Sequence, residues 1–410
     1  MPENTSTFFF GYIVVIATFI LQVVMYGPRS SYGVFFKPMQ ADFNWSRALI
    51  SGAYSISTIM QGLSSVIMGG LNDSLGPRVV MTICGLLLGL GFLLMSRINA
   101  AWQLYLFYIV IVGIGMGGLY APLVSTIARW FVKRRSMMTG IVIAGGGVGA
   151  TVLPPIVNWL ISTYDWRIAY ITIGASVLII ILITAQFLRR DPVKMGQLPY
   201  GENIEIEHRL EVTTDGFTLE EATRTRQLWM EISMIFCFGL CGITIMVHLV
   251  PHATDLGVSP AMAANIQATW GVAMLVGSIV LGIVADIIGI RRTFVLCFVL
   301  MSMALFWLLI ATEVWMLYIF AVVFGFGMGG IATLQSPLVA ELFGIRSHGL
   351  ILGVTNFCYT IGAASGPFLA GYIFDIRGSY QVSFVVCVVV SVTGLILAAT
   401  LRPVKEVRPK

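Results

Sequence analysis

Long apolar stretches alternate with short polar segments along the whole chain, and their lengths predict helices that cross a membrane. An α-helix needs about 20 mostly apolar residues to span the hydrocarbon core of a bilayer. Hydropathy and turn residues predict twelve such helices: 10–36, 47–71, 79–98, 102–129, 137–162, 167–188, 228–253, 261–288, 292–311, 314–341, 348–374 and 380–401. The pattern predicts an all-α membrane protein.

One long polar stretch, residues 190–226, divides the predicted helices into two sets of six. We therefore expect an N-terminal six-helix bundle over 1–189, a cytoplasmic linker over 190–226 and a C-terminal six-helix bundle over 227–410. Within the linker, Thr218 is followed by acids in the pattern of a capped helix start, which predicts a surface helix. The alternative is a solvated linker that only tethers the bundles.

Composition agrees with a membrane protein and argues against other classes. Of the 410 residues, 58% are hydrophobic and 10% are charged, whereas soluble domains carry roughly a quarter charged residues. The predicted spans carry no Ser-His-Asp set, no paired carboxylates at their centres and no metal cluster, so we expect no enzyme, cofactor, metal or nucleic-acid partner. A phosphate-binding loop is also missing, which indicates that ion or solute gradients supply the energy.

The distribution of basic residues predicts the orientation. Of the 24 Lys and Arg residues, 18 fall in loops on the side that carries both termini and 5 on the opposite side. Because loops rich in Lys and Arg stay in the cytoplasm, both termini are expected there. The predicted location is the inner (plasma) membrane, which the chain crosses many times.

Three motifs recur in the same order with a displacement of 212 or 213 residues. The first copies consist of Gly69, Asp73, Gly76 and Arg78; Gly113, Gly115, Gly117 and Gly118; and Gly140, Gly149 and Pro154. The second copies consist of Gly282, Asp286, Gly289 and Arg291; Gly325, Gly327, Gly329 and Gly330; and Gly353, Gly362 and Pro367. The constant register predicts two pseudo-symmetric halves in parallel orientation, with substrate bound near the midplane between them.

The first of these motifs resembles the loop signature of the major facilitator superfamily, and it is present in both halves. The resemblance implies the major facilitator fold and a gate at the cytoplasmic ends of helices 2 and 8. We expect its glycines to let helices approach closely, and its aspartates to accept hydrogen bonds from a helix N-terminus. The motif arginines are expected to bridge to these aspartates. The glycine runs of helices 4, 5, 10 and 11 serve either close packing or the bending of alternating access.

Within that superfamily, short stretches across most of the chain resemble the monocarboxylate transporter family and its bacterial relatives. These stretches are 26–39, 43–48, 129–135, 166–167, 218–229 and 247–257. The resemblance implies a transporter, acting as a monomer, that moves a small organic carboxylate. Protons or a counter-anion are the expected coupling partners. The alternative is a drug or hydrophobic-compound exporter, but helix 5 lacks the Gly-Pro pair typical of that class.

Arg29 is the leading candidate for the substrate site, because it lies inside the first predicted span. A buried cation is costly unless it meets water, a partner or an anion, and no span carries a carboxylate near its centre. We therefore expect Arg29 to bind the carboxylate of the substrate, and a basic residue stands at the matching place in the monocarboxylate transporters. The alternative is that its long side chain reaches the membrane surface.

The resemblance also leads us to expect an Asp–Arg pair in helix 8, but the matching residues are neutral, Met274 and Ser278. A single cation favours a substrate with one carboxylate.

Polar and aromatic residues of helices 4, 10 and 11 are further candidates for substrate binding: Tyr120, Gln335, Asn356, Phe357 and Tyr359. His248 of helix 7 is a candidate proton relay, because histidine titrates near physiological pH. For each, packing between helices is the alternative interpretation.

Overall fold

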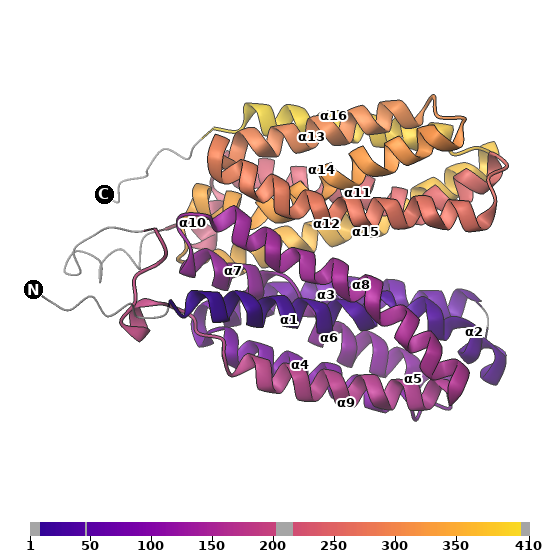
Figure 1. Cartoon of the computed structure of the whole chain (residues 1–410), viewed down its shortest axis with the longest axis horizontal. Helices are drawn as coiled ribbons and strands as arrows, with labels where there is room; N and C mark the ends of the chain where they lie inside the picture. The colour runs from indigo at the N-terminus through magenta and orange to yellow at the C-terminus, as the bar shows by residue number, and fades with distance from the viewer. Residues whose placement is uncertain (1–8, 46, 202–215, 403–410) are drawn as a thin grey trace, which may run out of the picture.

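The chain folds into long helices, of which most lie side by side along the longest axis of the molecule (Figure 1). The computed structural model describes residues 9–45, 47–201 and 216–402. In the first half, the long helices and their neighbours are α1 (Gly11–Ser30), α2 (Tyr32–Phe43), α3 (Arg47–Leu75), α4 (Pro77–Met95), α8 (Arg135–Thr163) and α9 (Trp166–Ala185). Within the described residues, isolated backbone bridges are the only β-type pairing.

The fourth span is built from short segments and not from one regular helix. These are α5 (Ala101–Leu104), the π-helical η1 (Tyr105–Val112), α6 (Gly113–Gly115), the 3₁₀-helical η2 (Met116–Gly118) and α7 (Ala121–Trp130). Tyr120, between η2 and α7, has φ −119° and ψ −73°, which interrupts the helix just before Pro122. The wide turns of a π-helix and the run of glycines make this segment irregular.

The second half consists of regular helices. They are α11 (Arg226–Asp255), α12 (Pro260–Ile288), α13 (Ile290–Leu308), α14 (Val314–Phe343), α15 (His348–Arg377) and α16 (Gln381–Thr400). The polar segment before them contains η3 (Val193–Met195) and the five-residue α10 (Leu219–Thr223), and the Thr218 side chain accepts a hydrogen bond from the Glu221 backbone N–H. Part of the expected linker, 202–215, lies outside the described residues.

Eleven helices of the described part are long and apolar enough to cross a membrane. The remaining long helix, α3, coincides with the second predicted span but is more polar than the others, since it carries residues such as Ser57, Gln61 and Ser64. These three side chains are buried, so α3 places its polar face toward other helices and not toward lipid. The all-α membrane architecture predicted from hydropathy is confirmed.

Buried apolar side chains form two clusters, one in each half of the chain. The first includes residues from Val14 to Leu188, and the second is formed mainly by residues from Leu228 to Leu401. Ala121 and Val124 of α7 belong to the second cluster although they stand in the first half. The two halves therefore pack directly against each other at α7.

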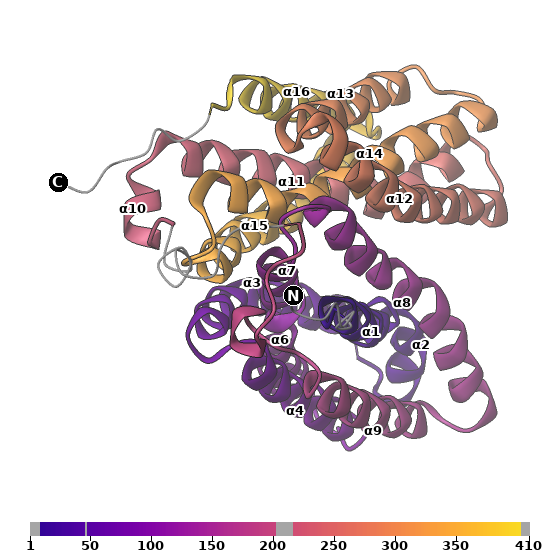
Figure 2. The same cartoon turned by 60° about the vertical axis from the view of Figure 1, so that its left-hand side comes forward.

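The most extensive packing between the halves joins α3 with α15 and α8 with α12. A Cβ atom on Gly69 of α3 would overlap the Gly349 carbonyl of α15, and one on Gly140 of α8 would overlap the Ser278 carbonyl of α12. The first helix begins and the last helix ends at the same end of the molecule, called the termini side below (Figure 1). From the termini side, α8 and α12 diverge toward the other end, called the opposite side (Figures 1 and 2).

Candidate functional site

Arg29 lies near the end of α1, half-buried among tyrosine side chains. Its guanidinium carbon is 5.8 Å from the centre of the Tyr26 ring, one helical turn earlier. Tyr54 of α3 and Tyr359 of α15 also interact with the guanidinium. Both halves of the molecule thus contribute to the surroundings of this cation.

No carboxylate of the described residues forms an ion pair with Arg29. The tyrosine hydroxyls around it are neutral and can also donate hydrogen bonds to an anion. A half-buried guanidinium with neutral neighbours suits a carboxylate, because Arg and carboxylate form two parallel charge-assisted hydrogen bonds. The arrangement gives Arg29 the surroundings of an anion-binding group.

Three of the predicted site residues lie on α15 but do not share one environment. Tyr359 reaches the surroundings of Arg29, and its ring packs 5.5 Å from the ring of Phe238 on α11. Asn356, one turn before Tyr359, is half-buried. Phe357 lines a separate apolar groove of ≈ 350 Å³ together with Ile59 of α3.

Tyr120 and Gln335 hold helices together in this conformation. The Tyr120 hydroxyl donates to the Ala332 carbonyl of α14 at 3.0 Å and so links the two halves. Gln335 is 4% exposed, and its amide nitrogen donates to the Thr355 hydroxyl at 3.0 Å. The structure therefore places both polar groups in contacts between helices.

His248 of helix 7, the candidate proton relay, and Ser278, one of the neutral residues of helix 8, also lie between packed helices. The ring nitrogen Nε2 of His248 is 3.0 Å from the Pro367 carbonyl, and the ring packs against Tyr380. The Ser278 hydroxyl is buried and lies 2.7 Å from the Leu275 carbonyl of its own helix and 3.4 Å from the Gly140 carbonyl of α8. These side chains connect helices that pack together.

Glu231 of α11 was missed by the sequence analysis. Its side chain is 0% exposed, and neither carboxyl oxygen has a hydrogen-bond partner within the described structure. The signal was present, since an acid stands inside the predicted span 228–253. Its place near the start of that span made it resemble a loop residue.

On the termini side, Asp73 at the end of α3 lies at the centre of a partly buried cluster. Its carboxylate accepts from the Leu350 backbone N–H of α15 at 2.9 Å and pairs with Arg129 of α7 at 3.1 Å. Arg129 also donates to the Ile345 carbonyl at 2.7 Å and lies 3.5 Å from Asp191. We call these five residues the Asp73 cluster; it connects the two halves through two independent bonds.

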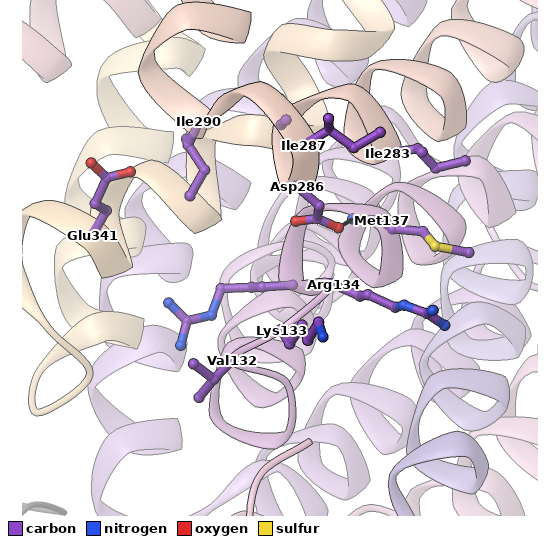
Figure 3. A pocket seen from close by; sticks show the side chains of 12 residues that line it. Val132, Lys133, Arg134, Met137, Ile283, Asp286, Ile287, Ile290 and Glu341 are labelled. Atoms are coloured by element: carbon purple, nitrogen blue, oxygen red, sulfur yellow. Dashed lines mark hydrogen bonds between the residues drawn. The ribbon is translucent and has the colours of Figure 1, made fainter. Parts of the chain in front are cut away.

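The corresponding residue of the second half, Asp286 at the end of α12, accepts from two backbone N–H groups at the start of α8. These belong to Ser136 at 3.1 Å and Met137 at 3.0 Å. Nearby, Arg291 pairs with Glu341 at 2.7 Å. We call these five residues the Asp286 cluster. An open pocket of ≈ 690 Å³ between the halves adjoins it (Figure 3).

The predicted bridge between each motif arginine and its own aspartate is wrong. Arg78 donates to the Gln186 side chain at 2.7 Å, and Arg291 pairs with Glu341. Both arginines follow a glycine with positive φ, Gly76 (86°) and Gly289 (98°), which turns the chain into the next helix. In the first half the cation beside the aspartate comes from α7, which the motif does not include.

Comparison with known proteins agrees with this architecture. The family model described as Major Facilitator Superfamily matches residues 18–253 and again 232–410. Monocarboxylate transporter 13 of Rattus norvegicus is 28% identical over 391 residues, covering 92% of this chain and 85% of that protein. Monocarboxylate transporter 7 of Homo sapiens is 24% identical, covering 96% and 86%.

Among solved structures, the human organic anion transporter MFSD10 (TETRAN) superposes with a TM-score of 0.71 at 15% sequence identity. The match covers 95% of this chain and 99% of that one. At this identity the likeness concerns the fold.

Proposed function

Because this chain belongs to the Major Facilitator Superfamily, a family of membrane transporters, we propose that it carries a small organic carboxylate by alternating access. The observation that carries the proposal is Arg29, a half-buried cation whose described neighbours are tyrosines and not acids. The relatives named monocarboxylate transporters support the same substrate class.

One cation at the site favours a substrate with one carboxylate. In this proposal the guanidinium of Arg29 binds the carboxylate, while Tyr54 and Tyr359 donate hydrogen bonds to it. Asn356 and Tyr26 then contact the rest of the substrate. Because these residues come from α1, α3 and α15, binding involves both halves, as alternating access requires.

We further propose that the termini side faces the cytoplasm and that the membrane is the inner or plasma membrane. The excess of Lys and Arg in the loops of that side supports this orientation. In the structure, the Asp73 and Asp286 clusters hold the halves together on the same side. They would accordingly act as the cytoplasmic gate.

The proposal is tested by uptake of labelled monocarboxylates into proteoliposomes that contain the wild-type protein or Arg29→Gln. Truncating one partner of a fully buried charge pair costs about 2–5 kcal/mol. Because Arg29 is half-buried, we expect the lower part of this range or less, so uptake efficiency should fall at least about tenfold. Arg97→Gln, which removes an exposed cation from a loop, is the matched control and should transport normally. Arg29→Lys should retain part of the activity, since the charge remains but the paired hydrogen bonds do not.

Normal uptake by Arg29→Gln would contradict the role of Arg29. Failure of the wild-type protein on the whole panel of monocarboxylates, together with export of hydrophobic compounds, would favour the exporter.

A further inference from the structure

The acidic side chain of Glu231 is fully buried inside the second half of the molecule. It lies in the second turn of α11 and faces α14 and α15. Gln335 of α14 is a polar neighbour whose amide nitrogen also donates to Thr355. Neither carboxyl oxygen has a hydrogen-bond partner among the described residues, and none of their basic side chains forms an ion pair with it.

An ionised carboxylate is very costly in such a place. Transfer of an unpaired carboxylate from water to an apolar interior costs far more than transfer of the neutral acid. Among the described residues, the titratable side chains that interact with Glu231 are Tyr120, directly before α7, and Cys358 of α15, and α14 contributes the neutral Gln335. None of these groups is a cation at neutral pH, so the carboxyl holds its proton while it is sealed.

The exclusion of water from Glu231 depends on the contact between the two halves. Tyr120, which interacts with Glu231, stands in the first half and donates to the Ala332 carbonyl in the second. If α7 and α14 separate on the termini side, this bond breaks and water can reach the carboxyl. The proton is then no longer held by burial.

Glu231 and the proposed substrate site share electrostatic neighbours. Tyr120 interacts with both Glu231 and Tyr359, and Tyr359 interacts with Arg29.

We propose that Glu231 is a proton-binding site that is occupied while the termini side is closed and is emptied when that side opens. Protonation then favours the closed conformation. This statement does not depend on the identity of the substrate.

Hydrogen exchange of the purified protein tests the conformational part of the proposal. Backbone exchange in α7 and at the termini-side end of α14 is compared at mildly acidic and mildly alkaline pH, after correction for intrinsic rates. If a single proton binds only the closed conformation, the ratio of closed to open molecules falls by up to about tenfold for each unit by which the pH rises. Wild-type protein should therefore exchange faster at alkaline pH.

Glu231→Gln mimics the protonated acid, so its exchange should stay slow and become independent of pH. Glu231→Leu removes the titrating group altogether and should behave in the same way. Glu313→Gln removes an exposed acid before α14 and should keep the wild-type pH dependence. Persistence of this dependence in both Glu231 variants would overturn the proposal, and so would failure of both neutral variants to fold.

Transport assays separate this proposal from the proposed function. Glu231→Gln should retain exchange of labelled for unlabelled carboxylate, at a rate that no longer depends on pH as the wild-type rate does. Arg29→Gln should lose exchange at every pH. Wild-type pH dependence of exchange in Glu231→Gln would contradict the proposal for Glu231, whereas normal exchange by Arg29→Gln would contradict only the proposed function.

Discussion

The Asp73 and Asp286 clusters occupy equivalent positions in the two halves but differ in polarity and burial. Arg129 in the first cluster and Glu341 in the second are related by the 212-residue displacement of the glycine runs, so a cation in one half corresponds to an acid in the other. Arg129 pairs with the motif aspartate, whereas Glu341 pairs with the motif arginine.

The two clusters also differ in how deeply their charged side chains are buried. The Arg129 side chain is 4% exposed, whereas Arg291 and Glu341 are 28% and 33% exposed. Only the first cluster has a side-chain cation that crosses between the halves, through the bond from Arg129 to the Ile345 carbonyl. In this chain the repeat therefore preserves the position of a contact between the halves without preserving its chemistry.

The largest effect is expected from Asp73→Asn. The substitution leaves the buried guanidinium of Arg129 with Asp191 as its remaining carboxylate partner in the described structure, at 3.5 Å. The closed conformation should lose about 2–3 kcal/mol, the range for charged hydrogen bonds and broken buried pairs. Faster hydrogen exchange at the start of α15 would measure the loss.

Asp42→Asn is the matched control for Asp73→Asn. Asp42 accepts from the Trp166 indole and from Arg167 at the opposite side, within the first half. These two bonds hold the pKa of the Asp42 carboxyl below its usual value. Its small contribution to stability is therefore present at neutral pH and is lost as the pH falls through that lowered pKa. At neutral pH the control removes a charge but should not loosen the termini side.

A smaller effect is expected from Asp286→Asn. Its carboxylate receives two backbone N–H bonds but no buried cation depends on it, and the asparagine oxygen can retain one bond. We expect the closed conformation to lose about 1–1.5 kcal/mol, the range for an ordinary hydrogen bond. Hydrogen exchange at the start of α8 would measure this loss of free energy. A loss as large as that caused by Asp73→Asn would mean that the two clusters contribute equally to the closed conformation.

The smallest effect is expected from Glu341→Gln. The pair of Glu341 with Arg291 is partly exposed and lies within one half, so the substitution should cost at most about 1 kcal/mol. The difference from wild type should shrink further at high salt, because salt screens exposed charges. A large cost that does not depend on salt would show that this pair is the main stabilising contact of the Asp286 cluster.

The helical architecture could be predicted from the sequence because bilayer thickness fixes the length of each span. The ninth span illustrates this, since 292–311 was predicted and α13 covers Ile290–Leu308. The close approach of α3 to α15 at Gly69 could also be anticipated, because small residues mark such contacts.

The candidate site could be predicted only in part. Arg29 was identifiable because a cation inside an apolar span has a clear cost, and Tyr26 could have been added because it stands one turn before Arg29. Tyr54 belongs to another helix, and the sequence does not specify which face of that helix meets Arg29. Glu231 required knowledge of its burial, which depends on Gln335 and Tyr120, both far away in the chain.

The partner of Asp73 could not be predicted for the same reason. Arg78 is near in sequence, but the turn at Gly76 carries it into the next helix, toward Gln186. Arg129 is 56 residues away and reaches Asp73 through tertiary packing.

The irregular fourth span gives the two halves different mechanical properties. Between Tyr105 and Tyr120 the backbone passes through π-helical and 3₁₀-helical turns, whereas its counterpart α14 is one continuous helix from Val314 to Phe343. Such turns weaken the regular hydrogen-bond ladder and often act as hinges. The first half can therefore bend at Tyr120, beside the bond to Ala332, while the second half supplies the rigid frame against which it moves.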